Sequence, residues 1–329
     1  MSTYQTQFVS DGSLLIAIIL LLGFFYLVYT LWDILFYIAV LILATSIVRR
    51  FFAKVNGIPL SKGADRMVFG LTDRVASEIG ISRINEIILT PDSGIGVGGV
   101  LNRRLLLGIA TLNEIDEDDL YNILFHEFAH IKGADNIIGT MMMGLDVAIR
   151  DLVQLAAYSM FISVLGLVMY LPTLLFYYIY TLITLAHSRA REYQADHVAA
   201  TFVGGERFGA SLEKYVKASE EFGYKINAVL NFHAQRRMLP DNLYAAYRAA
   251  SVQFSQDSQE RMSQYRRMTR QVTSPFSTHP ALESRLKQVS GIKGTAKGAG
   301  SGKAANMISD MQAREKELTK IIYKNNRLI

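Results

Sequence analysis

Two long stretches of this chain carry no charged side chain, and they limit its possible folds more than any other feature. Residues 13–32 are uncharged, and apolar sequence continues over residues 34–48 after a single acid. A second uncharged stretch covers residues 152–186. A helix needs about 20 apolar residues to cross the hydrocarbon core of a bilayer. Each block is therefore long enough for one tilted span or two short ones, because soluble helices rarely run this long without a polar face.

Turn residues and flanking charges predict how these blocks are arranged. Asp33 and Pro172 lie near the middle of their blocks, where hairpin turns would fall. Basic residues follow both blocks, the first of them Arg49, and positive charge collects on the cytoplasmic side of membrane segments. We therefore expect a multi-pass protein of the cell membrane, in contact with the lipid bilayer, with hairpins over residues 13–48 and 151–188. One long span in each block is the alternative.

Composition excludes several classes of function. The chain of 329 residues has no cysteine, which excludes disulfides, a thiolate metal site and a cysteine nucleophile. The net charge of +5 is modest and the basic residues are mixed with acids, so nothing indicates nucleic-acid binding. No feature of the sequence indicates an oligomeric state.

The polar sequence outside the two blocks divides by composition and periodicity. Helical spacing alternates with short strand-like runs between the blocks, and helical sequence resumes after the second block. A stretch rich in Gly, Lys and Ala then predicts a mobile linker. The predicted parts are an N-terminal tail (residues 1–12), a cytoplasmic catalytic part (49–150), a second catalytic part (189–289), the linker (290–304) and a C-terminal helix (305–329).

The sequence HEFAH, from His126 to His130, has the spacing of a helical metal site. Residues i and i+4 leave the same face of a helix, so both imidazoles can reach one zinc ion. Glu127 lies beside the first ligand, where it can accept a proton from a water molecule without binding the metal. The alternative is a pair of histidines on an ordinary amphipathic helix.

A catalytic zinc ion also needs a third protein ligand and an open position. Glu192 and Asp196 are again four residues apart on a predicted helix. One carboxylate can bind zinc while the other holds a ligand imidazole by hydrogen bonding. His187 and His197 are rival ligands, and an ordinary polar helix face is the alternative.

Three motifs resemble those of the M48 family of membrane zinc peptidases. They are HEFAHIKGAD, SRAREYQAD and STHPALESRL, which correspond to the HExxH, ExxxD and His-Pro motifs of that family. Their order among the membrane blocks is most similar to the HtpX group, and the resemblance covers roughly residues 13–288. It implies a mainly α-helical fold with a small β-sheet, that is, a zincin-like (gluzincin) catalytic domain with transmembrane helices.

The resemblance also implies a set of ligands and a base. One Zn²⁺ per chain would be held by His126, His130 and Glu192, and Glu127 would be the general base. Asp196 corresponds to the acid of ExxxD that supports the ligands.

Three further residues correspond to family positions, with alternatives. Asp135 matches an acid that often follows the second His, and capping a helix end is its alternative. His279 and Arg285 match a His and an Arg that lie near the scissile carbonyl, where two donors could stabilise an oxyanion. A helix cap and a surface arginine are the alternatives for this pair.

One departure from the family pattern concerns substrate binding. The family often carries an Asn-Ala motif on a strand before HExxH, and here the sequence reads PDSGIGVGGV. Residues 94–99 also fit GxGxxG, but a dinucleotide site requires a following helix, and the next residues read as a strand. We expect a loop or edge strand beside the cleft, with extended substrates pairing to residues 86–107.

The sequence thus predicts a membrane-anchored zinc metalloendopeptidase with its active site on the cytoplasmic side. It would hydrolyse membrane or misfolded proteins in quality control. The alternatives are a processing protease of narrow specificity, acting on prenyl proteins, lipoproteins or a regulator, and a non-catalytic membrane interaction protein.

Overall fold

The structure is a computed structural model that divides into two compact units, residues 1–52 with 143–177, and residues 53–142 with 178–329. The expected N-terminal tail and first membrane hairpin, residues 1–48, lie almost wholly outside the described residues. Described are residues 55–98, 103–132, 135–160, 164–251 and 277–327, with scattered positions from 19 to 49 and from 260 to 267; side chains are left out for residues 135–144 and 159–169.

The larger unit contains a four-stranded mixed sheet. The strands are β1 (Ile58–Pro59), β2 (Glu86–Thr90), β4 (Arg104–Gly108) and β3 (Ile95–Gly98), in that order across the sheet. The central strands β2 and β4 are parallel, and the other two pairs are antiparallel. Ile87 and Leu89 of β2 and Leu105 and Leu107 of β4 are fully buried, whereas Leu106 is half-buried. By the strand order, β1 and β3 are the edge strands of the described sheet.

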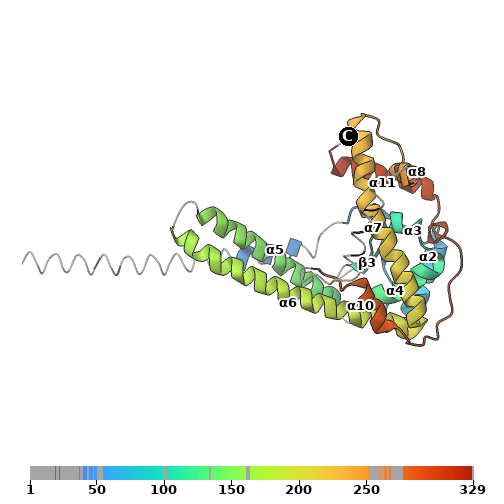
Figure 1. Ribbon diagram of the computed structural model, residues 1–329, viewed down its shortest axis with the longest axis horizontal. Helices are drawn as coiled ribbons and strands as arrows, with labels where there is room; N and C mark the ends of the chain where they lie inside the picture. The colour runs from blue at the N-terminus through green and yellow to red at the C-terminus, as the bar shows by residue number, and fades with distance from the viewer. Residues whose placement is uncertain are drawn as a thin grey trace, which may run out of the picture. The chain divides into compact units, whose positions relative to one another are not determined.

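Helix α4 (Glu117–Lys132) lies at the centre of this unit and carries HEFAH. It packs against α2 (Arg66–Ile79), α7 (Gly205–Gln235) and β3, so most of its residues are buried (Figure 1). Its first turn holds three acids, as the helix dipole favours, and Asp119 accepts a hydrogen bond from the Asp116 amide at 3.0 Å. The acidic first turn of α4 thus lies where the sequence predicted the start of this helix.

Two long helices follow α4. They are α5 (Asp135–Met160) and α6 (Val164–Val203), and together they contain the second uncharged block. Pro172 was expected at a turn but lies inside α6, so the middle of the block is helical. Among the described residues, no helix is both long enough and apolar enough to cross a membrane.

Shorter elements complete the larger unit. They are α3 (Ile109–Leu112), α8 (Leu243–Ser251), α10 (Leu282–Val289), the 3-10 helix η1 (Ala304–Met307) and α11 (Met311–Asn325). α10 packs on α7, and α11 packs on α8. A mainly α-helical fold with a small β-sheet is confirmed.

Residues 290–304 differ from the mobile linker that their composition predicts. Their backbone is hydrogen-bonded to the domain at several points, for example from the amides of Thr295 and Ala296 to the carbonyl of Phe202, each at 2.8 Å. The glycines here allow a close approach between backbones, and composition alone does not distinguish that use from flexibility.

The C-terminal helix α11 is anchored by the buried carboxylate of Glu315. Arg248 donates to it at 2.6 and 2.9 Å, Asn242 at 2.7 Å and Asn113 at 3.1 Å. Burial alone would raise the pKa of Glu315, but these hydrogen bonds and the charge of Arg248 outweigh burial and lower it. The helix is therefore held to α8 and to the segment before α4 by one ionised group.

Replacing Glu315 tests this anchor. We expect Glu315→Ala to lower the free energy of unfolding by about 1–3 kcal/mol at pH 7, measured by urea denaturation, since three donors lose their acceptor. Because the folded pKa is depressed, this stabilisation is present above the unfolded pKa of about 4.3 and is lost as the pH falls through the folded pKa. The exposed Glu317→Ala is the control, and equal effects of both variants would contradict the anchor.

Candidate metal centre

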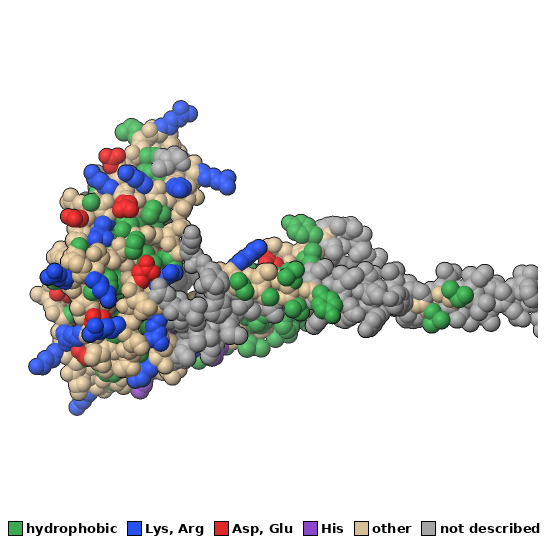
Figure 2. Space-filling model, turned by 180° about the vertical axis from the view of Figure 1, so that it is seen from behind, with side chains coloured by type: hydrophobic (Ala, Val, Ile, Leu, Met, Phe, Trp, Pro, Cys, Tyr) green, Lys and Arg blue, Asp and Glu red, His purple; other side chains and the backbone are tan. Residues whose placement is uncertain are grey.

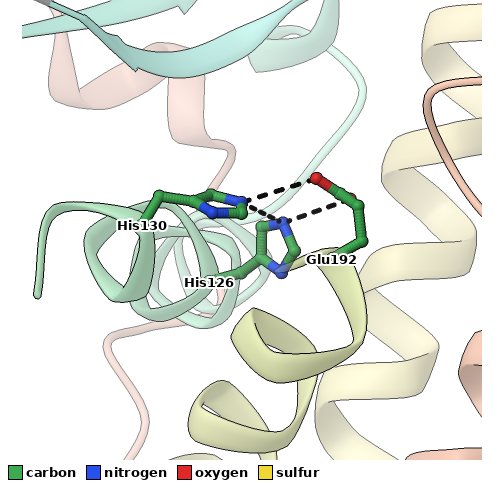
Figure 3. Close-up of side chains that lie close together, drawn as sticks. All are labelled: His126, His130 and Glu192. Carbon is green, nitrogen blue, oxygen red and sulfur yellow. Dashed lines mark hydrogen bonds and ion pairs between the residues drawn. The ribbon is translucent and has the colours of Figure 1, made fainter. Parts of the chain in front are cut away.

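Three side chains from two helices converge on one point in the larger unit (Figure 3). α4 supplies His126 and His130 from one face, and α6 supplies Glu192. The two Nε2 atoms are 3.3 Å apart, and the Glu192 oxygens lie 3.7 Å from His126 Nε2 and 3.5 Å from His130 Nε2. Donors on a tetrahedral ion with bonds of 2.0–2.1 Å are about 3.3–3.4 Å apart. The triangle therefore fits a zinc-sized ion with little movement.

The chemistry of this triangle also fits a cation. His126 and Glu192 are buried, and His130 is nearly so. Two ring nitrogens and a carboxylate that face each other away from water are compatible when a cation or shared protons lie between them. Two imidazoles with one carboxylate form a donor set of catalytic zinc sites, which leave a fourth position open. These residues could hold a metal ion.

Asp196 orients the imidazole of His126 from the side of the ring that faces away from the triangle. Its carboxylate is fully buried, and Oδ1 lies 2.9 Å from Nδ1 of His126. A carboxylate at this distance favours a proton on Nδ1, which leaves the Nε2 lone pair directed at the triangle. Burial alone would raise the pKa of Asp196, but hydrogen bonds from Arg285 and His126 lower it, so the carboxylate stays ionised.

Arg285 joins both carboxylates of α6. It donates to Asp196 through Nε and Nη2, each at 2.7 Å, and Nη2 lies 3.3 Å from Oε2 of Glu192. The side chain is buried, so the alternative of a surface arginine is wrong. Burial opposes the charge of Arg285, but the carboxylates outweigh burial and raise its pKa.

His279 reaches the same carboxylate from the loop before α10. Its Nδ1 lies 2.9 Å from Oε2 of Glu192, while 63% of the side chain is exposed. The residue that caps α10 is Ala281, so the alternative of a helix cap at His279 is wrong. The bonds of Ser188 and Arg189 to the backbone of residues 277–278, at 3.2 and 3.0 Å, hold this loop on α6. Burial would raise the pKa of Glu192, but the surrounding hydrogen bonds and charges lower it.

Glu127 lies beside the triangle and faces β3. A Cβ placed on Gly96 would be 4.0 Å from its Oε2, an ordinary van der Waals distance, so the carboxylate lies next to this position of the strand. Burial raises the pKa of Glu127, against the charges of His126 and His130. The carboxylate of Glu127 thus lies outside the group formed by His126, His130 and Glu192, which could bind a metal.

The other sequence candidates lie elsewhere. His187 and His197 are exposed and are not part of the metal-binding group among the described residues. Asp135 is the first residue of α5, and its side chain lies outside the described part of the chain.

Two residues of α7 border the centre, and sequence reasoning missed both. Phe208 stacks on the ring of His126 at 6.0 Å between centroids, and the Tyr215 hydroxyl accepts a hydrogen bond from the Ile95 amide at 3.1 Å. Burial and the charge of Glu127 raise the pKa of Tyr215 to about 12. Neither residue belongs to a motif, and no spacing connects α7 to the metal-binding helices.

Comparison with known proteins places these motifs in a family. The model of Peptidase family M48 matches residues 95–293. Protease HtpX homologues are similar: that of Bacillus pumilus is 25% identical over 50% of this chain and 60% of its own length, and that of Pyrococcus abyssi is 26% identical over 67% and 71%. The homologue of Methanopyrus kandleri is 30% identical over 42% of this chain and 46% of its own length. The match thus spans about half to two thirds of these relatives.

A solved structure is also similar. The crystal structure of S. mikatae Ste24p is 16% identical, with a TM-score of 0.46, and the match covers 78% of this chain and 58% of that one.

The family match includes every residue of the centre. Residues 95–293 contain β3, HEFAH on α4, the two acids of α6 and the His-Pro motif before α10. This stretch is more than half of the 329 residues. The chain belongs to peptidase family M48.

Proposed function

We propose that this chain is a zinc-dependent endopeptidase. His126, His130 and Glu192 would hold one Zn²⁺, and Glu127 would act as general base. The observation that carries the proposal is the ligand triangle with the separate, half-buried carboxylate of Glu127 beside it. A zinc ion in the triangle would supply a Lewis acid that activates water and polarises the scissile carbonyl.

The proton transfers fall to Glu127. Its carboxylate would accept a proton from the attacking water and then deliver that proton to the leaving amine, as general acid–base catalysis requires. Glu127 follows His126 on the same helix, so its side chain points beside the triangle. It can therefore accept a proton from water without becoming a metal ligand. This arrangement supports a hydrolase more than a structural metal site, which would need no base.

We assign different roles to the two donors of the His-Pro segment. Arg285 is engaged by Asp196 and Glu192, so it would position the carboxylates that support and form the ligand triangle. His279 contacts Glu192 through Nδ1 and keeps most of its ring exposed. Its Nε2 could therefore donate to the oxyanion that forms on a bound substrate.

The edge strand β3 offers a backbone for an extended substrate. The Gly94 carbonyl accepts from Gly108 on the neighbouring strand, so alternation directs the groups of Ile95 and Val97 to the other edge. Tyr215 binds the Ile95 amide, and no described strand pairs with this edge. A peptide that adds to it would lie beside Glu127, whose carboxylate faces Gly96.

Membrane anchoring is the second part of the proposal. Large apolar side chains of α6 are exposed, among them Leu171, Leu175, Phe176, Ile179 and Ile183, and Figure 2 shows hydrophobic side chains gathered along these helices. Contiguous apolar surfaces of this kind mark contact with a membrane or a partner. With the uncharged block at residues 13–32, they support a multi-pass protein of the cell membrane. The basic residues that follow both blocks favour a cytoplasmic active site.

The similar HtpX homologues and this anchoring favour membrane or misfolded proteins as substrates. A site tethered near a bilayer would reach loops that extend from it. Quality control of membrane proteins is therefore the role that we propose.

Replacing the base tests the peptidase activity. We expect Glu127→Gln to lower kcat about 10²- to 10⁴-fold, because the amide cannot accept the proton, while zinc content is retained. Cleavage of an unfolded model protein in detergent, with zinc measured on the same samples, gives both quantities. The exposed Glu206→Gln serves as control. Undiminished cleavage by Glu127→Gln would contradict the role of this residue.

Removing one amide tests the edge strand. Proline at position 97 lacks the N–H that would bind a substrate carbonyl, and edge strands tolerate proline where that group faces outward. We expect Val97→Pro to raise KM several-fold more than Val97→Ala, which keeps the amide, when a peptide substrate is titrated. Equal KM values for the two variants would argue against pairing at β3.

A further inference from the structure

The segment after the family domain connects the two helices that supply the metal ligands. We define residues 292–304 as the strap; the family match ends within its first two residues. We propose that the strap is a positioning element of the metal centre, which ties the end of α6 to the start of α4 and thereby sets the distance between Glu192 and the two histidines. The inference rests on the proposed metal site.

The strap first binds the end of α6. The amides of Thr295 and Ala296 both donate to the Phe202 carbonyl at 2.8 Å, and the Gly205 amide donates to Ile292 at 2.8 Å. The last carbonyls of a helix have no partner within the helix, so the strap satisfies one of them. Phe202 lies ten residues after Glu192 on the same helix.

The strap then binds the start of α4. The Glu117 amide donates to the Gly302 carbonyl at 2.8 Å, and the Ala299 amide donates to Oδ1 of Asp118 at 2.9 Å. Ala304 donates to the Ile115 carbonyl at 3.0 Å. The Gly302 carbonyl thus caps one of the unpaired amides at the positive end of α4, about 13.5 Å before His126 at 1.5 Å per residue.

Two arginines hold the middle of the strap through its carbonyls. Arg207, at the start of α7, donates to Ala296 at 3.0 Å and forms a bidentate ion pair with Asp118. Arg74, on α2, donates to Lys297 at 2.9 Å. The strap is therefore fixed by charged groups of the helices that pack on α4, in addition to its backbone bonds.

Two glycines show how closely the strap fits. A Cβ on Gly294 would overlap the backbone of Val203 and Gly204, at the end of α6. A Cβ on Gly298 would lie 2.6 Å from Oδ1 of Asp118 and 2.9 Å from Nη2 of Arg207. A side chain at position 294 would push the backbone of the strap away from α6, whereas one at position 298 would displace the carboxylate of Asp118 and the guanidinium of Arg207.

The contacts of the strap matter for the metal because metal binding tolerates only small changes in the distances between the ligands. Metal–ligand distances in working sites vary by about 0.2 Å, whereas packed helices can shift past each other by about 1–2 Å. Phe125 and Phe202 stack at 4.8 Å between centroids and join α4 to α6 sideways. The strap adds directional hydrogen bonds at one end of each helix, which resist sliding.

The test uses Gly298→Ala in the full chain, whose new methyl group meets the Asp118 and Arg207 side chains. Lys297→Ala, which trims an exposed neighbouring side chain, is the control. We expect Gly298→Ala to weaken zinc binding about tenfold, the scale on which displaced supporting groups act. Competition with a chromophoric chelator measures affinity, and thermal unfolding of the metal-free protein measures stability. Combining Gly298→Ala with Asp118→Ala should give a non-additive effect, because the carboxylate that the methyl group would displace is gone.

Three results would overturn the proposal. They are an unchanged zinc affinity of a folded Gly298→Ala protein, even with lower stability; additive effects in the double variant; and loss of folding by Gly298→Ala, which would show a general structural role. Failure of the wild type to bind zinc would instead contradict the proposed function, and the unfolding data would still report whether the strap is attached as described.

Discussion

The contact between the carboxylates of α6 and the imidazoles of α4 is the interaction on which the rest of this unit depends. Burying Glu192 and Asp196 would be costly without partners, since an unpaired buried charge loses its hydration. Arg285 and the two histidines supply those partners. The cluster carries two acids against one permanent positive charge, so its net negative charge favours a bound cation. Stability and metal binding are therefore coupled in the same few side chains.

The arrangement around this contact explains why the sequence separates the motifs so widely. HEFAH on α4 and Glu192 on α6 meet at the centre, although α5 and the second uncharged block lie between them in the chain. The His-Pro segment returns to hold Glu192, and the strap returns to hold the ends of both helices. The His-Pro segment and the strap thus both add contacts to α4 and α6, so the centre depends on segments from several parts of the larger unit.

The chemistry-bearing residues could be predicted because helical spacing encodes them. His126 and His130 must share a face if the segment is a helix, and the same holds for Glu192 and Asp196. The structure confirms that these four side chains meet, and that the fold is mainly helical with a small sheet. Their catalytic roles stay predictions, as does the zinc ion.

Other features could not be predicted, for reasons that lie in long-range contacts. Arg285 is a buried ion-pair partner because of acids about 90 residues earlier, so its own surroundings in the sequence give no signal of burial. The composition of residues 290–304 predicts flexibility, but Gly294 and Gly298 allow close packing on α6 and α4. The part played by Tyr215 depends on the position of β3, which no local pattern fixes.

Zinc K-edge X-ray absorption on the purified chain, with zinc counted per protein, shows most directly whether the two histidines and Glu192 bind the metal. We expect one zinc ion with four or five nitrogen and oxygen ligands at about 2.0–2.2 Å, two of which show the scattering of imidazole rings. Glu192→Ala should lose one light ligand and keep both imidazoles. A protein that binds no zinc, or binds it without imidazole scattering, would contradict the claim that His126, His130 and Glu192 form the metal centre.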